Sequence, residues 1–291
     1  MKFIHISDIH LPIKVPIFSL RGKMISGYLN YSLRRRKLHP VAVIESLLSF
    51  IQKTDYDCLI LSGDITNVSH KLEFEEARKL LDPILNEKAF LIPGNHDRYM
   101  ESSVNPVDLY EKYFGEFSGD KIPNSEGEYI RIKKIKDLTL IGWDSNAPTP
   151  IAIATGFVKP KVIEITKKYL TENKIKQYAL VCHHPIWNPP DGFESEYHKM
   201  KNREEVVSLI QDFPPIAYFH GHCHSNWIRN KTTNSPYHII NSASTTRLGS
   251  HTHKTGFHVG ELQKDSLQIK RYAFDKSEQS FKEDSLVWYE K

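Results

Sequence analysis

The sequence is poor in cysteine, in long apolar runs and in net charge. Its 291 residues include three cysteines, Cys58, Cys182 and Cys223, which are odd in number and far apart. We therefore expect no disulfide framework and a reducing, cytoplasmic compartment. No stretch approaches the ~20 apolar residues that a membrane span needs. The opening stretch MKFIHISDIH is too polar for a signal peptide, and a net charge of +4 does not by itself indicate nucleic acid.

The chain also lacks a Gly/Ser linker, an internal repeat and a low-complexity block. Its first half alternates strand-like runs with helical periodicity, whereas its second half adds successive strand-like runs. We therefore expect one domain over residues 1–291 that contains two sheets. The polar tail from about residue 276 carries one apolar cluster at 286–289, so docking on the body and a loose end are both open.

Hydrophobic periodicity locates the individual elements. It predicts strands over 2–7, 58–61, 89–93, 129–132, 138–141, 178–181, 216–219, 237–240, 257–261 and 267–272. It predicts helices over 41–53, 72–85, 107–114, 161–170 and 203–210.

Histidine is abundant, with 15 in the chain, and many of these residues follow strand-like runs. A single D-x-H or His-His-Pro occurs by chance in many chains. Ligands of open α/β sheets, however, bind at the carboxyl ends of strands. Several polar motifs that each follow a strand-like run therefore predict a ligand-binding site. Five motifs share this position: Asp8-Ile-His10, Gly63-Asp-Ile-Thr-Asn67, Gly94-Asn-His-Asp97, His183-His-Pro185 and Gly221-His-Cys-His224.

The residue types in these motifs indicate metal chemistry. In a D-x-H or H-x-H pair, the period of two along a strand points both side chains the same way. Imidazole nitrogen mixed with carboxylate and amide oxygen suits Zn, Fe, Mn or Ni, and suits neither a thiolate site nor Ca. The candidate ligands exceed what one ion can use, whereas two ions that share a carboxylate, as in phosphatases and nucleases, would use them all.

With these five motifs over roughly residues 3–224, the chain resembles the calcineurin-like metallophosphoesterase family. The resemblance implies an α/β fold, a four-layer αββα sandwich of two packed mixed β-sheets flanked by helices, with metals at the strand ends. It further implies that Asp64 bridges two divalent or trivalent ions. It assigns the other ligands as Asp8, His10 and His224 for the first ion and Asn95, His183 and His222 for the second.

The same resemblance implies further roles around the two ions. A hydroxide that bridges them would attack the phosphoester. Asn95 and His96 would face the substrate, with His96 stabilising the transition state or protonating the leaving oxygen, and Asp97 would orient His96. Arg98 either contacts phosphate or is a surface residue.

Several neighbouring residues have plainer interpretations. His183 is favoured over His184 as the ligand, and Asn67 is expected to brace the Gly63 loop. Cys182 and Cys223 are expected to pack, and His251 and His253 to lie in a polar loop. The family often has a Gly-rich element where this chain has Asn241-Ser-Ala-Ser-Thr-Thr246, which leaves the shape of the substrate rim open.

Residues 13–40, which we call the basic segment, interrupt the α/β pattern directly after His10. They contain seven cations, no acid and many apolar side chains. The segment is either a cap or packing element of the molecule itself or a contact surface. As a contact surface it could meet an anionic lipid surface, another copy in an oligomer, or nucleic acid. Trp187, Asn188, Phe193 and Tyr197 are candidates for the opposite wall of the site.

We expect a metal-dependent phosphoric ester hydrolase that acts on a small phosphoester in the cytoplasm. A phosphodiester is favoured over a monoester, because the motif forms resemble the class III cyclic nucleotide and glycerophosphodiester phosphodiesterase branch. One alternative is a lipid-linked pyrophosphatase or phosphatase peripheral to the membrane, and an exonuclease ranks after it. Another is a non-catalytic scaffold, such as the retromer subunit that keeps this fold without key ligands.

Overall fold

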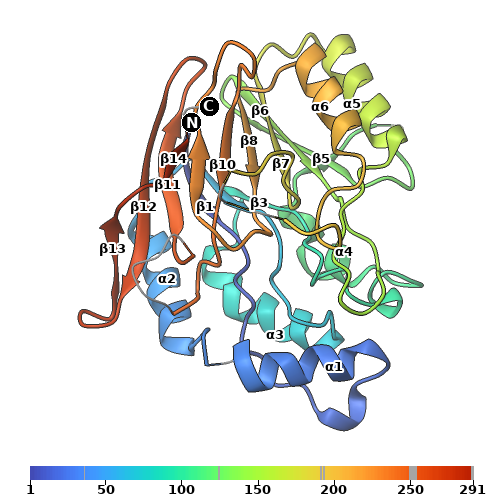
Figure 1. Ribbon diagram of the computed structural model, residues 1–291, viewed down its shortest axis with the longest axis vertical. Coiled ribbons are helices and arrows are strands. Elements are labelled where there is room, and N and C mark those ends of the chain that lie inside the picture. Colours follow the sequence, from blue (N-terminus) through green and yellow to red (C-terminus); the bar gives the residue numbers. More distant parts are fainter. Residues whose placement is uncertain (36, 124, 191, 193, 249–253, 290–291) are drawn as a thin grey trace.

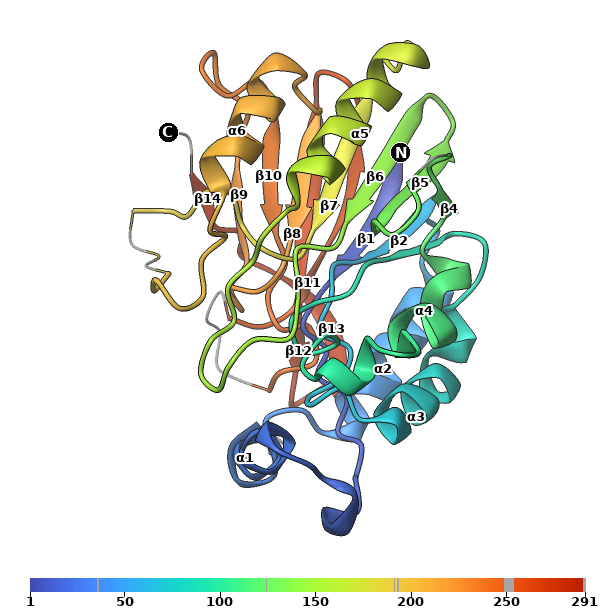
Figure 2. The ribbon, with the colours of Figure 1, turned by 90° about the vertical axis from the view of Figure 1, so that its right-hand side faces the viewer.

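The computed structural model describes residues 1–35, 37–123, 125–190, 192, 194–248 and 254–289. Within these residues, two mixed sheets pack face to face and helices cover their outer faces (Figures 1 and 2). This is the four-layer αββα sandwich that the resemblance to the metallophosphoesterase family implies. No helix in the described ranges combines the length and the apolar character needed to cross a membrane.

The first sheet contains six strands in the described part of the chain, in the order β13-β12-β11-β1-β2-β3. Its parallel half is formed by β1, β2 and β3, and β11 joins β1 antiparallel. The strands are β1 (Lys2–Ile6), β2 (Cys58–Leu61), β3 (Ala89–Leu91), β11 (Phe257–Leu262), β12 (Leu267–Asp275) and β13 (Ser280–Asp284).

The second sheet contains eight strands in the described ranges, in the order β14-β9-β10-β8-β7-β6-β5-β4. Its centre, β10-β8-β7-β6, is parallel. The strands are β4 (Asp120–Lys121), β5 (Ile130–Ile135), β6 (Leu138–Trp143), β7 (Tyr178–Cys182), β8 (Ala217–His220), β9 (Trp227–Arg229), β10 (His238–Asn241) and β14 (Trp288–Tyr289).

Helices flank both sheets. Helices α2, α3 and α4 pack on the six-stranded sheet, and α5 and α6 pack on the eight-stranded one (Figure 2). The α-helices are α1 (Lys23–Asn30), α2 (Val41–Lys53), α3 (Lys71–Leu81), α4 (Leu109–Phe114), α5 (Pro160–Glu172) and α6 (Arg203–Asp212). Short helical turns at Ile17–Ser19, Tyr31–Arg35, Asp82–Ile84, Glu101–Ser103 and Gly115–Phe117 complete the set.

The alternation along β2 shows why the parallel strands are apolar throughout. Cys58 and Ile60 point into the core between the two sheets, whereas Leu59 and Leu61 point into the core beneath the helices. Both faces are buried, so both phases of the strand carry apolar side chains. The polar residues that follow such a strand therefore lie at its carboxyl end, outside both cores.

Two segments with open interpretations have defined structures. The tail docks on the body, because β13 pairs with β12 and β14 pairs with β9. The basic segment forms α1 and two short helical turns at the lower end of the molecule, apart from both sheets (Figures 1 and 2). Arg36 lies outside the described residues.

Candidate metal centre

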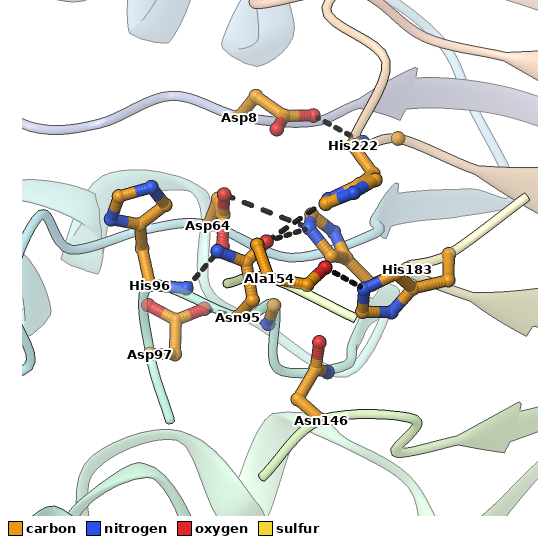
Figure 3. A network of polar contacts seen from close by, with 12 residues as sticks. Asp8, Asp64, Asn95, His96, Asp97, Asn146, Ala154, His183 and His222 are labelled. Carbon is orange, nitrogen blue, oxygen red and sulfur yellow. Dashed lines mark hydrogen bonds and ion pairs between the residues drawn. The ribbon is translucent and has the colours of Figure 1, made fainter. Parts of the chain in front are cut away.

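The five motifs follow five strands whose carboxyl ends meet at one edge of the sandwich. Strands β1, β2 and β3 are neighbours in one sheet, and β7 and β8 are neighbours in the other. The loops after them place Asp8, Asp64, Asn95, His183 and His222 so that their side chains point toward one another (Figure 3). The predicted ligands thus come together in space.

One half of this cluster is formed by four groups whose ligand atoms all lie within 4.8 Å of one another: Asp8, His10, Asp64 and His224. The Nε2 atoms of His10 and His224 are 3.3 Å apart, and Nε2 of His224 is 3.0 Å from Oδ1 of Asp8. Three of the four residues are buried and His224 is half-buried. Carboxylates and imidazoles at this spacing form a possible metal site.

The other half is centred on the Asn95 side chain. Its Oδ1 lies 3.1 Å from Nε2 of His183 and 3.0 Å from Nδ1 of His222. Asp64 stands between the two halves, with Oδ2 at 3.7 Å from Nε2 of His10 and 3.6 Å from Nε2 of His183. A carboxylate in this position can contact ligands of either half.

Backbone carbonyls fix which ring nitrogen faces the cluster. A carbonyl only accepts, so the nitrogen beside it carries the proton: Nδ1 of His183 donates to Ser62 O at 2.7 Å, and Nε2 of His222 donates to His198 O at 2.9 Å. The opposite nitrogen of each ring, which faces Asn95, then presents a lone pair in the neutral imidazole. Acceptor atoms about 3 Å apart with no proton between them fit a cation between them.

The charge states agree with this arrangement. Burial lowers the pKa of His183 and His222, so that both rings are neutral at pH 7. Burial alone would raise the pKa of the Asp8 carboxyl, but His224 and His183 outweigh this effect and hold it below its usual range. An ionised carboxylate beside neutral imidazoles is the protonation state that metal binding requires.

Backbone strain is concentrated in the same residues. In the described ranges, ten residues other than glycine have positive φ, and five of them are candidate ligands. A non-glycine residue in this conformation costs roughly 1–2 kcal/mol, and such strain clusters at functional sites. The five are Asp8 (49°), His10 (40°), Asp64 (59°), His222 (68°) and His224 (49°).

Two glycines of the motifs are required by close approach of the loops. A Cβ on Gly94 would lie 2.2 Å from Oδ1 and 2.4 Å from the backbone N of Asp64. A Cβ on Gly63, which has φ of +107°, would lie 2.6 Å from Nδ1 of His183. Glycine at these positions therefore lets the loops after β2 and β3 meet around Asp64.

His96 lies half-buried beside this cluster. Its Nδ1 is 2.5 Å from the carbonyl oxygen of Asn67, and its ring stacks on Tyr99 with centroids 5.8 Å apart. Because the carbonyl accepts the Nδ1 proton, Nε2 is the nitrogen that can exchange a proton with a bound molecule. The ring also lies edge-on to His10, with centroids 4.8 Å apart, so it is close to the candidate ligands.

Asp97 differs from the expectation that it orients His96. Its buried carboxylate accepts the backbone N–H groups of Gly94 (2.9 Å), Ile65 (3.1 Å) and Thr66 (2.9 Å), and the Thr66 hydroxyl (3.0 Å). These contacts tie the loop after β2 to the loop after β3. Asp97 therefore holds the two loops together, and the Asn67 carbonyl is the partner of Nδ1 of His96.

Arg98 is not a surface residue, and its guanidinium is paired with two carboxylates of the chain. Its side chain is buried, Nε donates to Asp144 at 2.8 Å, and Nη1 donates to Asp108 at 2.5 Å. A buried guanidinium needs such partners because an unpaired charge there is costly. The substrate-binding role expected for Arg98 is therefore replaced by an ion-pair network behind the site.

The structure also shows the surroundings of His184, Asn67 and the two cysteines of the motif regions. The ring nitrogens of His184 contact Ser145 Oγ (2.8 Å) and the Ala154 carbonyl (3.0 Å), and its ring packs beside the His222 ring with centroids 4.3 Å apart. Asn67 braces the loops, because its Nδ2 donates to Leu11 O at 2.8 Å. Cys182 is buried in the core, and Cys223 is half-buried with Sγ 3.5 Å from Oδ1 of Asn188. The predictions for His251, His253 and Phe193 lie outside the described residues.

Of the residues expected to form the opposite wall of the site, only some lie near the candidate ligands. Trp187 packs against Trp227 with centroids 5.1 Å apart, and Tyr197 is exposed. Asn188 lines a cavity of about 380 Å³, whose lining includes His198 and His222. This cavity borders the group of candidate ligands through His222.

Supporting groups around the site were missed by the sequence analysis. They include the carbonyls of Ser62 and His198, which carry no sequence signal because every residue has a carbonyl. They also include the 241–246 element, which is buried and braces the β1 exit: Ser244 Oγ donates to Asp8 O at 2.7 Å, and Thr246 Oγ1 donates to Ile9 O at 2.5 Å. This element therefore supports the strained backbone at Asp8 instead of forming a rim.

Two solved phosphatases share this fold. A dimetal phosphatase from Danio rerio has a TM-score of 0.61 and 13% identity, and the match covers 93% of this chain and 95% of that one. Purple acid phosphatase PPD1 from yellow lupin has a TM-score of 0.61 and 11% identity, covering 99% of this chain and 53% of that one. At these identities the likeness shows the fold. Together with the cluster of candidate ligands and the family match below, it defines the chain as a metal-dependent phosphoric ester hydrolase.

A family model described as calcineurin-like phosphoesterase matches residues 1–226. The chain belongs to the calcineurin-like phosphoesterase family, whose members use divalent metal ions. A Ruthia magnifica protein named "Probable cyclic nucleotide phosphodiesterase" is 22% identical over 233 residues, which is 78% of this chain and 88% of that protein. A protein of the same name from Vesicomyosocius okutanii is 23% identical over 184 residues, or 62% of this chain and 68% of that protein.

Proposed function

We propose that the chain hydrolyses phosphodiesters with two metal ions held at the strand ends. The observation that carries the proposal is the position of Asp64 between two groups of acceptors, at 3.7 Å from His10 and 3.6 Å from His183. Asp8, His10 and His224 would hold one ion, Asn95, His183 and His222 the other, and Asp64 would bridge them. The donor set suits Mn, Fe, Zn or Ni.

The ions, when bound, would supply a hydroxide nucleophile near neutral pH and neutralise charge on the phosphoryl oxygens. The residues of the chain supply the rest. Asn95 and His96 would face the bound phosphate, and Nε2 of His96 would donate a proton to the leaving oxygen. Asp97 keeps His96 in reach indirectly, since it fixes the loop after β2 whose Asn67 carbonyl holds the ring.

A diester substrate is favoured by the two relatives named as cyclic nucleotide phosphodiesterases. The rival scaffold function is disfavoured, because every candidate ligand is present and the ring nitrogens are aligned for binding. Action on a lipid-linked phosphate requires, in addition, that the protein reach a membrane, which is a separate question. A cytoplasmic location remains our expectation from the cysteine content.

The test compares bis-p-nitrophenyl phosphate with p-nitrophenyl phosphate, first in metal-free protein and then with Mn, Fe, Ni or Zn added. We expect cleavage only with metal and a higher kcat/KM for the diester. A preference for the monoester would contradict the diesterase assignment. Binding of two metal ions without cleavage of either ester would support the scaffold instead.

A further inference from the structure

The basic segment is a built part of the molecule and not a loose loop. Its inner side forms a small core of its own, and the Tyr28 hydroxyl accepts the Val15 N–H at 2.9 Å. Lys23 donates from Nζ to the Thr149 carbonyl and lies over the Tyr99 ring at 4.1 Å from its centroid. The core consists of Val15, Leu20, Met24, Tyr28, Tyr31 and Val68.

The outer side of the same segment is apolar and exposed. Ile17 and Phe18, in the turn before α1, are 76% and 83% exposed, and Leu33, after α1, is 73% exposed. Ile25 and Leu29 on α1 are about half exposed, at 47% and 53%. Five large apolar side chains, each about half exposed or more, thus lie within 17 consecutive residues. Exposed apolar side chains that gather in this way mark candidate interaction surfaces.

Cations accompany this apolar surface. Lys14, Arg21 and Lys37 are exposed, and the sequence adds the run Arg34-Arg35-Arg36 with no acid between residues 13 and 40. Apolar side chains that enter the acyl boundary, beside cations that meet anionic headgroups, are the features of an interfacial membrane helix.

We propose that the outer side of the basic segment docks on an anionic lipid surface. A second copy fits less well, because a symmetric contact places the same patch on both copies. It would bring the exposed Lys14, Arg21 and Lys37 of one copy against the same cations of the other, with no acid in either segment. Nucleic acid also fits less well, because bases stack on aromatic rings and Phe18 is the single aromatic among the five exposed apolar side chains.

Docking would bring the metal centre to the membrane surface. The inner side of the basic segment packs on Val68, Tyr99 and Met100. Val68 directly follows the motif residue Asn67, and Tyr99 and Met100 lie two and three positions after the motif residue Asp97. The small core of the basic segment therefore lies between the loops of the candidate site and the outer side of the segment. A phosphoester in or near the headgroup region would be accessible to the docked protein.

The test is co-sedimentation of the full chain with vesicles of phosphatidylcholine that contain phosphatidylglycerol, and with vesicles of phosphatidylcholine alone. We expect binding to the anionic vesicles that weakens as salt is raised. Ile17→Ser/Phe18→Ser should weaken this binding at least about tenfold, because each side chain loses its apolar burial in lipid. Ile17→Leu/Phe18→Leu keeps apolar side chains and should bind like the unmodified chain.

Two double variants that each remove two positive charges test the contribution of the cations separately from that of the apolar side chains. Lys14→Ser/Lys37→Ser should weaken binding about 25-fold, at roughly fivefold per cation. Lys174→Ser/Lys176→Ser removes two exposed lysines from the turn after α5 and should have no effect. Because all of these side chains are exposed, thermal unfolding should be unchanged, which excludes misfolding as the cause.

Four results would overturn the proposal. They are absence of binding to anionic vesicles, equal binding to phosphatidylcholine alone, unchanged binding by Ile17→Ser/Phe18→Ser, and dimerisation that this variant abolishes. Binding of single-stranded DNA in place of vesicles would likewise overturn it in favour of nucleic acid. None of these measurements uses catalysis, so the outcome is independent of the proposed phosphodiesterase activity.

Discussion

His96→Ala tests the proposed proton transfer when it is assayed on two leaving groups. Nδ1 of His96 lies 2.5 Å from the Asn67 carbonyl, so Nε2 is the nitrogen that can donate to a leaving oxygen. An alkoxide leaving group needs that proton, whereas p-nitrophenolate departs readily as an anion. The variant should therefore be impaired far more on a dialkyl phosphodiester than on bis-p-nitrophenyl phosphate.

General acid catalysis contributes about 10²–10⁴-fold, which corresponds to about 3–5 kcal/mol of activation free energy. We expect a loss of this size in kcat/KM on the dialkyl ester and a loss below about tenfold on the p-nitrophenyl ester. Both metal ions should remain bound, because the ligand set proposed here does not include His96. The assay is steady-state kinetics together with metal analysis of the purified variant.

Tyr99→Leu is the control, since it removes the ring stacked on His96 at 5.8 Å and leaves the imidazole in place. It should change both substrates by a similar small factor. Equal large losses on both esters in His96→Ala would refute proton donation and assign His96 to charge stabilisation. Unchanged turnover would refute any catalytic role for this residue.

Three further predictions follow from the site and its surroundings. Asp64→Asn should lower metal affinity by at least about 10–100-fold and abolish most activity. Asp137→Asn, an exposed control with the same charge change, should change neither property. Titration of both variants with metal measures the difference in affinity. Arg98→Met should lower the free energy of unfolding in urea by about 3–5 kcal/mol with KM unchanged, and a raised KM at unchanged stability would restore a substrate role. The metal-free protein should lose thermal stability as the pH falls below about 6.5, because burial lowers the pKa of eight of the described histidines: His5, His70, His183, His184, His220, His222, His238 and His258. The unfolded chain then binds protons that the folded one cannot, at up to about 1.4 kcal/mol per pH unit for each group. Burial raises the pKa of Glu73 and Glu194 to about 7 and also raises that of Asp97, so these three carboxyls act in the opposite direction. They are three against eight, so a melting temperature that rises on acidification would contradict this assignment.

The sequence determined the elements whose signals are local. Helix α2 spans Val41–Lys53 as predicted, because apolar residues repeat with helical period directly after Pro40. The parallel strands were predictable from short apolar runs, since both of their faces are buried. The candidate ligands were predictable for the same reason, because each motif directly follows its strand.

The tertiary structure decided everything that depends on distant partners. Strands β4, β9, β13 and β14 are short or polar, and pairing with a neighbouring strand makes them strands. Arg98 is buried because Asp144, 46 positions away, pairs with it. Asp97 binds loop amides that are 31 and 32 positions away.

The same division holds within the metal centre. Its candidate ligands could be identified from motifs, but the nitrogen that His183 and His222 each turn toward Asn95 could not. Carbonyls of Ser62 and His198, 121 and 24 positions from their histidines, fix that choice. Backbone groups are the same in every residue, so only the folded chain shows which of them hold the ligands in place.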